Sequence, residues 1–204
     1  MFLALWIGGC GLDLLTKHWV FQWPSGPGKN GEWWLVENYV GIQKALNYGA
    51  MWGIGQGHAN VFAALSVLAA LGILVWVVKG DALRDWSLTV ALGGVLGGIF
   101  GNLYDRLGLW GGVTATGQPL RAVRDWILFC YHEHTWPNFN VADCLLVGGA
   151  VLLAWHAFQH GGEAHESKGG TDEASATVDS SSPYDGNTSA ASQPAERPDT
   201  RLAG

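Results

Sequence analysis

The chain has 204 residues, of which 49% are hydrophobic and 14% charged, with a formal net charge of -6. It contains no basic patch of the kind that binds nucleic acid, so nucleic-acid partners are excluded. The mean hydropathy of +0.14 is that of a soluble protein. This average conceals two unlike parts, because residues 1–160 are apolar and rich in Trp, whereas residues 161–204 are polar. The polar part lacks hydrophobic periodicity, and we expect it to be a disordered C-terminal tail.

Four apolar stretches lie within residues 1–160 and are long enough to be transmembrane helices. A bilayer core of about 30 Å requires about 20 helical residues. Residues 61–78 and 86–104 contain no charged residue. Residues 2–21 carry Asp13, Lys17 and His18 towards their end, and residues 141–158 carry Asp143 near the start and His156 near the end. We therefore expect an all-α membrane protein with four transmembrane helices and both termini on one side.

The connections between these stretches differ in length. Residues 79–85 join the second and third stretches, whereas the other two connections have about forty and about thirty-six residues and emerge on the same side. Residues 32–36 and 40–42 have the character of short strands. We expect a compact extracytoplasmic layer over the helices. A count of Lys and Arg would instead place the long connections in the cytoplasm.

Small and aromatic residues indicate how the helices pack and where they meet the lipid headgroups. Five glycines along residues 86–104 recur at a spacing of four, which lets helix backbones approach closely in lipid. They are Gly93, Gly94, Gly97, Gly98 and Gly101. Several of the twelve Trp residues flank the apolar stretches, as interface anchors do, although packing in the interior is the alternative for some of them. These are Trp19, Trp23, Trp33, Trp34, Trp86, Trp110, Trp126 and Trp136.

Two aspartates are the strongest candidates for chemistry. Asp125 lies beyond the third stretch and Asp143 begins the fourth. An ionised carboxylate in hydrocarbon costs several kcal/mol, so such residues are kept mainly where they have a function. Both would lie at the mouth of the helix bundle on one membrane face, where two carboxylates can share a proton and activate water. This arrangement predicts an aspartic protease.

Other polar residues favour supporting roles. Asp13 and Lys17 are four apart, which predicts an ion pair near the interface with Lys17 extending outward to the headgroups. Asn140 is expected to cap the last helix, with Asp143 in its first turn. A contribution of Asp105 and Arg106 to a structural salt-bridge network is one interpretation, but Arg106 could instead bind a substrate carbonyl or phosphate through its planar fork. We expect Asp105 to be structural and Arg106 to line the site.

A metal site is not supported by the sequence. His132, Glu133 and His134 lack the further ligands that zinc requires, and we expect them to be solvated. His156 and His160 lie on the other side of the membrane and are interpreted in the same way. The three cysteines form no CxxC pair, so a zinc site or a disulfide framework is also not predicted. No metal and no cofactor are expected.

Five short motifs together resemble those of the type II lipoprotein signal peptidases. They are Asp13-x-x-Thr16-Lys17, Asn47-Tyr48-Gly49-Ala50, Gly97-Gly98-x-x-Gly101-Asn102-x-x-Asp105-Arg106, Val123-x-Asp125-Trp126 and Phe139-Asn140-x-Ala142-Asp143. They occur in the family's order, and the third and fifth are specific. The chain departs from the family's usual pattern at Met51-Trp52-Gly53, at Arg121 in place of a glycine, and in a longer stretch from Leu107 to Arg124.

The resemblance implies a four-helix aspartic endopeptidase of the bacterial inner membrane with a small extracytoplasmic β-cradle. Its partners would be membrane lipid and diacylglyceryl-modified prolipoproteins, which it would cut just before the modified Cys. We expect it to be a monomer with both termini in the cytoplasm, against the charge count, and an active site near the extracytoplasmic face.

The resemblance also implies roles for individual residues. Asp125 and Asp143 would be the catalytic pair. The substrate would be bound by Asn47, Asn102, Arg106 and Asn140. Structural support would come from Asp13 and Lys17, alongside Asp105.

A small four-helix ion or proton transporter is the alternative. A transporter places polar groups through the depth of the membrane, commonly in repeated halves. The second and third stretches are nearly free of ionisable residues, and no internal repeat is visible. A purely structural scaffold would leave the two aspartates without a purpose, so the protease interpretation is favoured.

Overall fold

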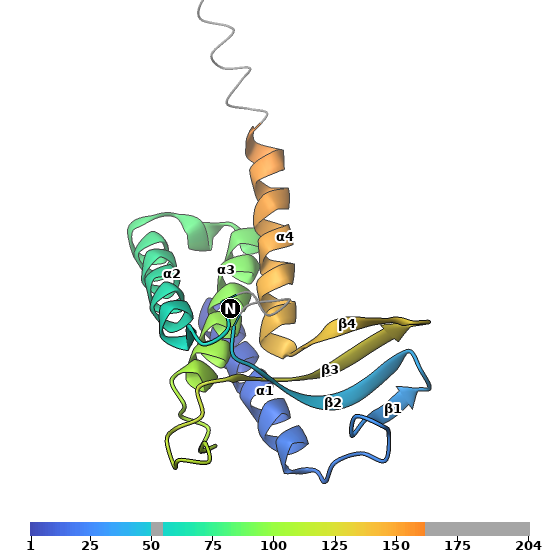
Figure 1. Cartoon of the computed structure of the whole chain (residues 1–204). Helices are drawn as coiled ribbons and strands as arrows, with labels where there is room; N and C mark the ends of the chain where they lie inside the picture. The colour runs from blue at the N-terminus through green and yellow to red at the C-terminus, as the bar shows by residue number, and fades with distance from the viewer. Residues whose placement is uncertain (50–54, 162–204) are drawn as a thin grey trace, which may run out of the picture. The chain divides into compact units, whose positions relative to one another are not determined.

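Four helices of equal length and one small sheet make up the computed structural model, which describes residues 1–49 and 55–161 (Figure 1). The helices are α1 (Phe2–Gln22), α2 (Ala59–Lys79), α3 (Trp86–Arg106) and α4 (Val141–Gly161), and a 3₁₀ turn, η2 (Ala82–Arg84), precedes α3. Each helix has 21 residues. At 1.5 Å per residue this is about 31 Å, close to the thickness of a bilayer core. The expected tail lies outside the described residues, apart from Gly161 at the end of α4.

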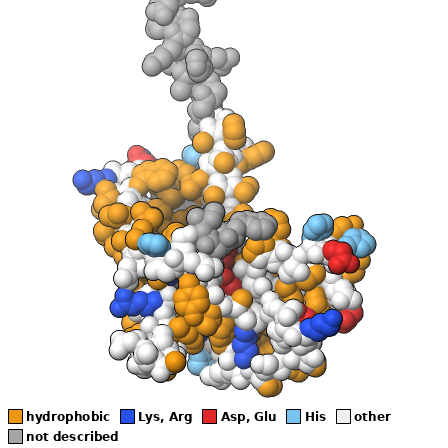
Figure 2. Space-filling view, in the orientation of Figure 1, with side chains coloured by type: hydrophobic (Ala, Val, Ile, Leu, Met, Phe, Trp, Pro, Cys, Tyr) orange, Lys and Arg blue, Asp and Glu red, His pale blue; other side chains and the backbone are white. Residues whose placement is uncertain are grey.

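Three of the helices described, namely α2, α3 and α4, are long and apolar enough to cross a membrane. Helix α1 is equally long but carries Asp13 and Lys17 in its second half. Figure 2 shows hydrophobic side chains gathered over α2 and α4, where lipid rather than protein would be the neighbour. Three of the four predicted spans are thus supported by length and composition.

Helix α3 lies at the centre of the bundle and is buried along most of its length. One row of glycines faces α1. A Cβ atom would lie 3.1 Å from the carbonyl oxygen of Phe2 at Gly93, and 3.1 Å from that of Trp6 at Gly97. These separations are tighter than ordinary side-chain contacts, so the two backbones meet closely only because the side chains are absent.

A second glycine row, one residue along, faces α4. A Cβ atom at Gly98 would lie 2.5 Å from the carbonyl oxygen of Ala142 and 2.8 Å from Cγ of Leu146. The predicted small-residue stripe is therefore a packing surface on two sides, with α1 against one row and α4 against the other. The first turn of α4 is held close to α3 by this contact.

The four-stranded sheet is antiparallel throughout, in the order β1-β2-β3-β4. Its strands are β1 (Trp33–Val36), β2 (Val40–Asn47), β3 (Val123–Tyr131) and β4 (His134–Phe139). It lies beside the ends of the helices from which the long connections leave (Figure 1). The two expected short strands, at 32–36 and 40–42, are confirmed, although β1 begins at Trp33 and β2 extends to Asn47. Strands β3 and β4 were not predicted from the residues themselves.

Arg124 of β3 attaches the sheet to the helices. Its side chain donates to Oδ1 of Asp105 from Nη2 at 2.7 Å and from Nε at 3.1 Å, and its backbone N–H donates to Oδ2 at 3.0 Å. The guanidinium also lies over the rings of Phe21 and Trp110, at 5.9 and 5.1 Å from their centres. The guanidinium thus donates twice to this carboxylate and lies over two aromatic rings, an arrangement that suits Arg better than Lys.

Asp105 has two charged partners in this network. Within the described residues Asp105 pairs with Arg124 and Lys17, and not with its neighbour Arg106. Adjacent helical residues point in different directions, whereas residues from other elements converge at the end of α3. Lys44 of β2 adds a further attachment, because its ammonium donates to the carbonyl oxygens of Phe21 and Trp23 at the end of α1.

We predict that Gly98→Ala destabilises the protein by about 1–3 kcal/mol, because the new methyl group overlaps a backbone carbonyl that cannot rotate away. The measurement is thermal unfolding in detergent. Gly148→Ala is the matched control, since no atom lies within 4 Å of a Cβ at that helical position. Alanine there should be neutral or stabilising by up to about 1 kcal/mol. Equal melting temperatures for both variants would contradict the two-sided packing of α3.

Candidate active site

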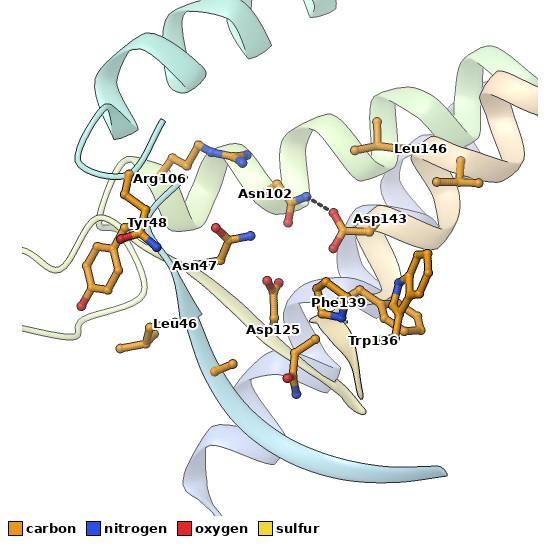
Figure 3. A pocket seen from close by; sticks show the side chains of 15 residues that line it. Leu46, Asn47, Tyr48, Asn102, Arg106, Asp125, Trp136, Phe139, Asp143 and Leu146 are labelled. Atoms are coloured by element: carbon orange, nitrogen blue, oxygen red, sulfur yellow. Dashed lines mark hydrogen bonds between the residues drawn. The ribbon is translucent and has the colours of Figure 1, made fainter. Parts of the chain in front are cut away.

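A cavity of about 470 Å³ opens where the sheet meets the ends of α3 and α4. Carboxylate, amide and guanidinium groups face its interior, and Trp136 and Phe139 of β4 lie on one side (Figure 3). The cavity is lined by Ala45, Leu46, Asn47, Tyr48, Gln56, Asn102, Arg106, Asp125, Trp136, Pro137, Asn138, Phe139, Asp143, Leu146 and Val147. Both of the predicted catalytic aspartates belong to this set.

Asp125 reaches the cavity from strand β3, where it is paired with Ala45 of β2. Successive side chains of a strand point to opposite faces, so Arg124 turns towards the helices and Asp125 towards the cavity. Only 2% of Asp125 is exposed. Its Oδ1 accepts a hydrogen bond of 2.6 Å from Nδ2 of Asn140, and Asn47 is a second partner. The sequence predicted that Asp125 lies at the mouth of the helix bundle. In the structure a strand supplies this carboxylate to the cavity.

Asp143 is placed by the cap of α4. Its backbone N–H donates to Oδ1 of Asn140 at 3.0 Å, and the backbone N–H of Asn140 donates to Oδ2 of Asp143 at 3.2 Å. This reciprocal pair is a capping box, with Asp in the place usually taken by Glu or Gln. The predicted N-cap is confirmed. A second donor to this carboxylate, Nδ2 of Asn102, lies 2.8 Å from Oδ1 of Asp143 (Figure 3).

The two carboxyl groups point into the same space (Figure 3). Burial, and then the neighbouring Asp143 carboxylate, raise the pKa of Asp125 to about 7, although its hydrogen bonds from Asn140 and Asn47 oppose the shift. Removal of a carboxylate from water disfavours its charged form, and a second negative charge nearby does the same. The pair therefore retains a proton up to about neutral pH.

Asp13 and Lys17 form the predicted ion pair, with 2.7 Å between Oδ2 and Nζ, but both side chains are fully buried. The expectation that Lys17 extends outward is wrong. Its ammonium points into the bundle, 2.9 Å from Oδ1 of Asn102 and 3.4 Å from Oδ2 of Asp105. These oxygens replace the water that a buried ammonium loses. Asp13 in turn accepts the backbone N–H of Ala142 at 2.9 Å.

Arg106 and Asn47 face the cavity from opposite sides. The guanidinium of Arg106 lies 5.5 Å from the centre of the Phe62 ring, and its Nη2 is 3.5 Å from the carbonyl oxygen of Gly49. Asn47, at the end of β2, accepts the backbone N–H of Gly49 at 3.0 Å. The cavity thus has a cation and an amide near the carboxyl groups, which are suitable groups for binding a peptide.

No group of three His, Cys, Asp or Glu residues that could hold a metal occurs in residues 1–49 and 55–161. His132 and Glu133 form the turn between β3 and β4, where they are exposed, and His134 begins β4. The three cysteines are free. Met51-Trp52-Gly53 lies outside the described residues.

Sequence reasoning missed Arg124 and the aromatic wall of the cavity. Arg124 is adjacent to Asp125 in the sequence. The burial of Arg124 could have been predicted only if residues 123–131 had been recognised as a strand, because Arg124 and Asp125 then point to opposite faces of the sheet. Trp136 and Phe139 were interpreted as an interface anchor and as part of a motif. Their place on β4 depends on pairings of β3 with β4, such as Phe129 with Trp136.

The comparison with known families decides the classification. A model of the family described as signal peptidase (SPase) II matches residues 5–159. The chain belongs to this family. Curated relatives named lipoprotein signal peptidase include one from Rhodopirellula baltica, 46% identical over 78% of this chain and 71% of the relative. Another, from Symbiobacterium thermophilum, is 35% identical over 60% and 72%.

Solved structures agree on the fold. Two bacterial membrane enzymes determined by the in meso method each superpose with a TM-score of 0.63, at 22% and 21% identity. Each match covers 78% of this chain, and 87% and 93% of the two structures. The predicted membrane enzyme of the signal peptidase II family is thus confirmed, and the transporter alternative finds no support.

We predict that activity falls as the pH rises through about 7. The raised pKa of Asp125 means that it holds its proton below that pH and loses it above. Hydrolysis by two carboxyl groups requires one of them to be protonated, so kcat/KM should decline about tenfold per pH unit on the alkaline side. The measurement uses a substrate without groups that titrate between pH 5 and 9.

The raised pKa of Asp125 also makes the stability of the folded protein depend on pH. A carboxyl whose folded pKa is raised stabilises the folded state fully below its unfolded pKa, near 3.9, and this contribution is lost as the pH rises to about 7. Asp125→Asn cannot ionise and should flatten the fall in melting temperature over that window. An unchanged pH dependence in this variant would show that another group causes the fall.

Proposed function

We propose that this protein is an aspartic endopeptidase of the bacterial inner membrane that removes signal peptides from prolipoproteins, cutting just before a diacylglyceryl-modified Cys. One observation supports this proposal most strongly. Strand β3 and helix α4 present Asp125 and Asp143 to a single cavity, in a chain of the signal peptidase II family. The active site would lie near the extracytoplasmic face.

In the proposed reaction, the ionised carboxylate of the pair takes a proton from water as the water oxygen attacks the scissile carbonyl carbon. The protonated carboxyl gives its proton to the carbonyl oxygen, which yields a neutral tetrahedral intermediate. The first carboxyl then protonates the leaving nitrogen, and the second recovers its proton as the carbonyl re-forms. Asp125 suits the protonated role below about pH 7 because of its raised pKa.

Substrate would be positioned by groups around the two carboxyls. Arg106 and Asn47 can bind peptide carbonyl oxygens, and Asn102 and Asn140 hold the carboxyl groups in place. A second, apolar hollow of about 450 Å³ lies between α2, α3 and α4 and shares Arg106 and Leu146 with the cavity. Its walls suit the acyl chains of a lipid-modified Cys, whose peptide would then extend past Arg106 to the aspartates.

The domain organisation is also part of the proposal. Residues 1–160 would form the peptidase, with α1 as a fourth span and the sheet as an extracytoplasmic cradle, and the polar residues that follow would be dispensable for activity. The protein would act as a monomer, without metal, cofactor or nucleic acid. Helix α1 is as long as the other three and packs closely on α3, which supports its insertion despite its two charges.

We predict that Asp125→Asn and Asp143→Asn each reduce cleavage of a diacylated prolipoprotein by at least about a thousandfold, since either change leaves the pair unable to exchange a proton. The shape of the side chain is preserved, so insertion and folding should be retained. The assay follows release of the signal peptide by the purified protein in detergent or bilayers.

Asp81→Asn is the matched control, because Asp81 is exposed and pairs only at the surface with Arg84, far from the cavity along the chain. This variant should cleave at the wild-type rate. Full activity in either cavity variant would refute the aspartic mechanism, even though the family assignment would stand.

We predict that both termini face the cytoplasm. In a variant whose native cysteines are replaced, a cysteine at Lys29 should react with an impermeant reagent in intact cells, and one at Lys79 should react only after lysis. Lys29 lies between α1 and β1, and Lys79 ends α2. The reverse pattern would place the cavity on the cytoplasmic side and contradict the proposed substrate.

A further inference from the structure

The side-chain amides of Asn140 and Asn102 contact the two carboxyl groups, Asn140 at Asp125 and Asn102 at Asp143. Each amide is oriented by a group that can only donate hydrogen bonds. The backbone N–H of Asp143 faces Asn140, so the atom of Asn140 that it meets must be Oδ1, and the NH2 group must turn towards Asp125. The ammonium of Lys17 faces Asn102 at 2.9 Å. An ammonium has three donors and no acceptor, so the atom of Asn102 that it meets must also be the oxygen.

The orientation of Asn102 determines what Asp143 receives. With its oxygen towards Lys17, Asn102 directs its NH2 group to Oδ1 of Asp143 at 2.8 Å. The same oxygen also accepts from Nδ2 of Asn140 at 3.2 Å, which reinforces the orientation. Both oxygens of Asp143 therefore accept an N–H, one from Asn102 and one from the backbone of Asn140. Donors on both oxygens favour the ionised carboxylate.

A reversed Asn102 would have the opposite effect. Its oxygen would then lie about where its nitrogen now lies, within hydrogen-bonding distance of a carboxylate oxygen. Two acceptors at that distance repel unless one carries a proton. Asp143 would take up the proton to form the bond, and the carboxylate needed to activate water would be lost.

We propose that Lys17 is a positioning residue for catalysis, which fixes the Asn102 amide so that Asp143 stays the ionised base and Asp125 the proton donor. This inference rests on the proposed aspartic mechanism. It assigns Lys17 more than the structural support expected from the sequence. The ion pair with Asp13 neutralises the charge of Lys17. The contact with Asn102 has a different effect, because it orients the Asn102 amide so that its NH2 group donates to Asp143.

Other ionisable groups lie near the pair. Arg106 from α3 interacts electrostatically with both carboxyl groups, and the Cys144 thiol lies beside Asp143 on α4. Asp13 of α1 lies at the first turn of α4, and Asp105 at the end of α3 pairs with Lys17. None of these contacts Asn102 by a hydrogen bond among the described residues, so the amide is oriented by Lys17 and Asn140.

The test compares Asp13→Asn with the double variant Asp13→Asn/Lys17→Met. Both lack the ion pair, and both keep an Oδ1 atom at position 13 to accept the N–H of Ala142. They differ in the Lys17 ammonium, which donates to Asn102 and also pairs with Asp105. The second donor to the Asn102 oxygen, Nδ2 of Asn140, is present in both. The pH dependence of kcat for a diacylated prolipoprotein is measured for each, together with KM and the melting temperature in detergent.

We expect Asp13→Asn to retain the acidic limb of the wild-type pH profile. In the double variant this limb should move upward by about one pH unit, because the protonated form of the base is now stabilised by donating a hydrogen bond to the oxygen of the reversed amide. The value of kcat should fall at least about tenfold while KM stays within about twofold, since the substrate contacts are unchanged. Adding Asn102→Leu to the double variant should shift the limb no further.

Identical acidic limbs in Asp13→Asn and the double variant, with a difference in melting temperature alone, would overturn the proposal and leave Lys17 a structural residue. If the double variant does not fold, Asp13→Asn/Lys17→Leu replaces it, because leucine likewise has no hydrogen-bond donor for Asn102, and it should show the same shift. Activity in Asp125→Asn or Asp143→Asn would instead refute the aspartic mechanism, so the two failures are distinguishable.

Discussion

The buried carboxylate of Asp105 holds together the parts of the molecule that build the cavity. It neutralises Lys17 from α1 and Arg124 from β3, and all three side chains are removed from solvent. Loss of the carboxylate would leave two buried cations with fewer partners, and breaking a buried pair typically costs about 3–5 kcal/mol. The sheet is joined to the bundle at this point, so the place of Asp125, one residue beyond Arg124, depends on it.

Rigid elements, rather than mobile loops, position both carboxyl groups. A paired strand fixes Asp125, and a capping box fixes Asp143 in the first turn of α4. That turn is held from two further sides, by Asp13 at the backbone of Ala142 and by the close contact of Gly98 with the carbonyl of the same residue. Helix packing, capping and the ion-pair network therefore converge on one peptide segment, which suits a site that must hold its geometry.

The burial that gives Asp125 its raised pKa also costs stability. A carboxyl group that is 2% exposed loses its hydration, and the partners it has gained are neutral amides rather than cations. Two of the nearby cations are paired elsewhere, since Lys17 pairs with Asp13 and Arg124 with Asp105, whereas Arg106 lines the cavity itself. The ion pairs of Lys17 and Arg124 therefore lie next to the site without involving Asp125 or Asp143, and these two carboxyl groups can still exchange a proton.

The sequence by itself determined the helices and the identity of the polar residues in the cavity. Apolar runs of bilayer length and a glycine spacing of four specify helices and their packing stripe through local geometry alone, and the motifs located Asp125, Asp143, Asn102, Asn140 and Arg106. Strands β3 and β4 were not evident, because the adjacent polar residues Arg124 and Asp125 are both buried, on opposite faces, and so disguise the alternation on which strand prediction relies.

Only the tertiary structure decided which of these residues meet. Lys17 was expected to extend towards the headgroups, but Asn102, Asp105 and Asp13 offer its ammonium oxygen partners, and two of these are more than eighty residues away in sequence. Strand β2 pairs with β3, so Ala45 lies opposite Asp125 although both α2 and α3 separate the two residues in the sequence. Contacts of this kind have no local signature, because they depend on the packing of helices and sheet rather than on any one segment.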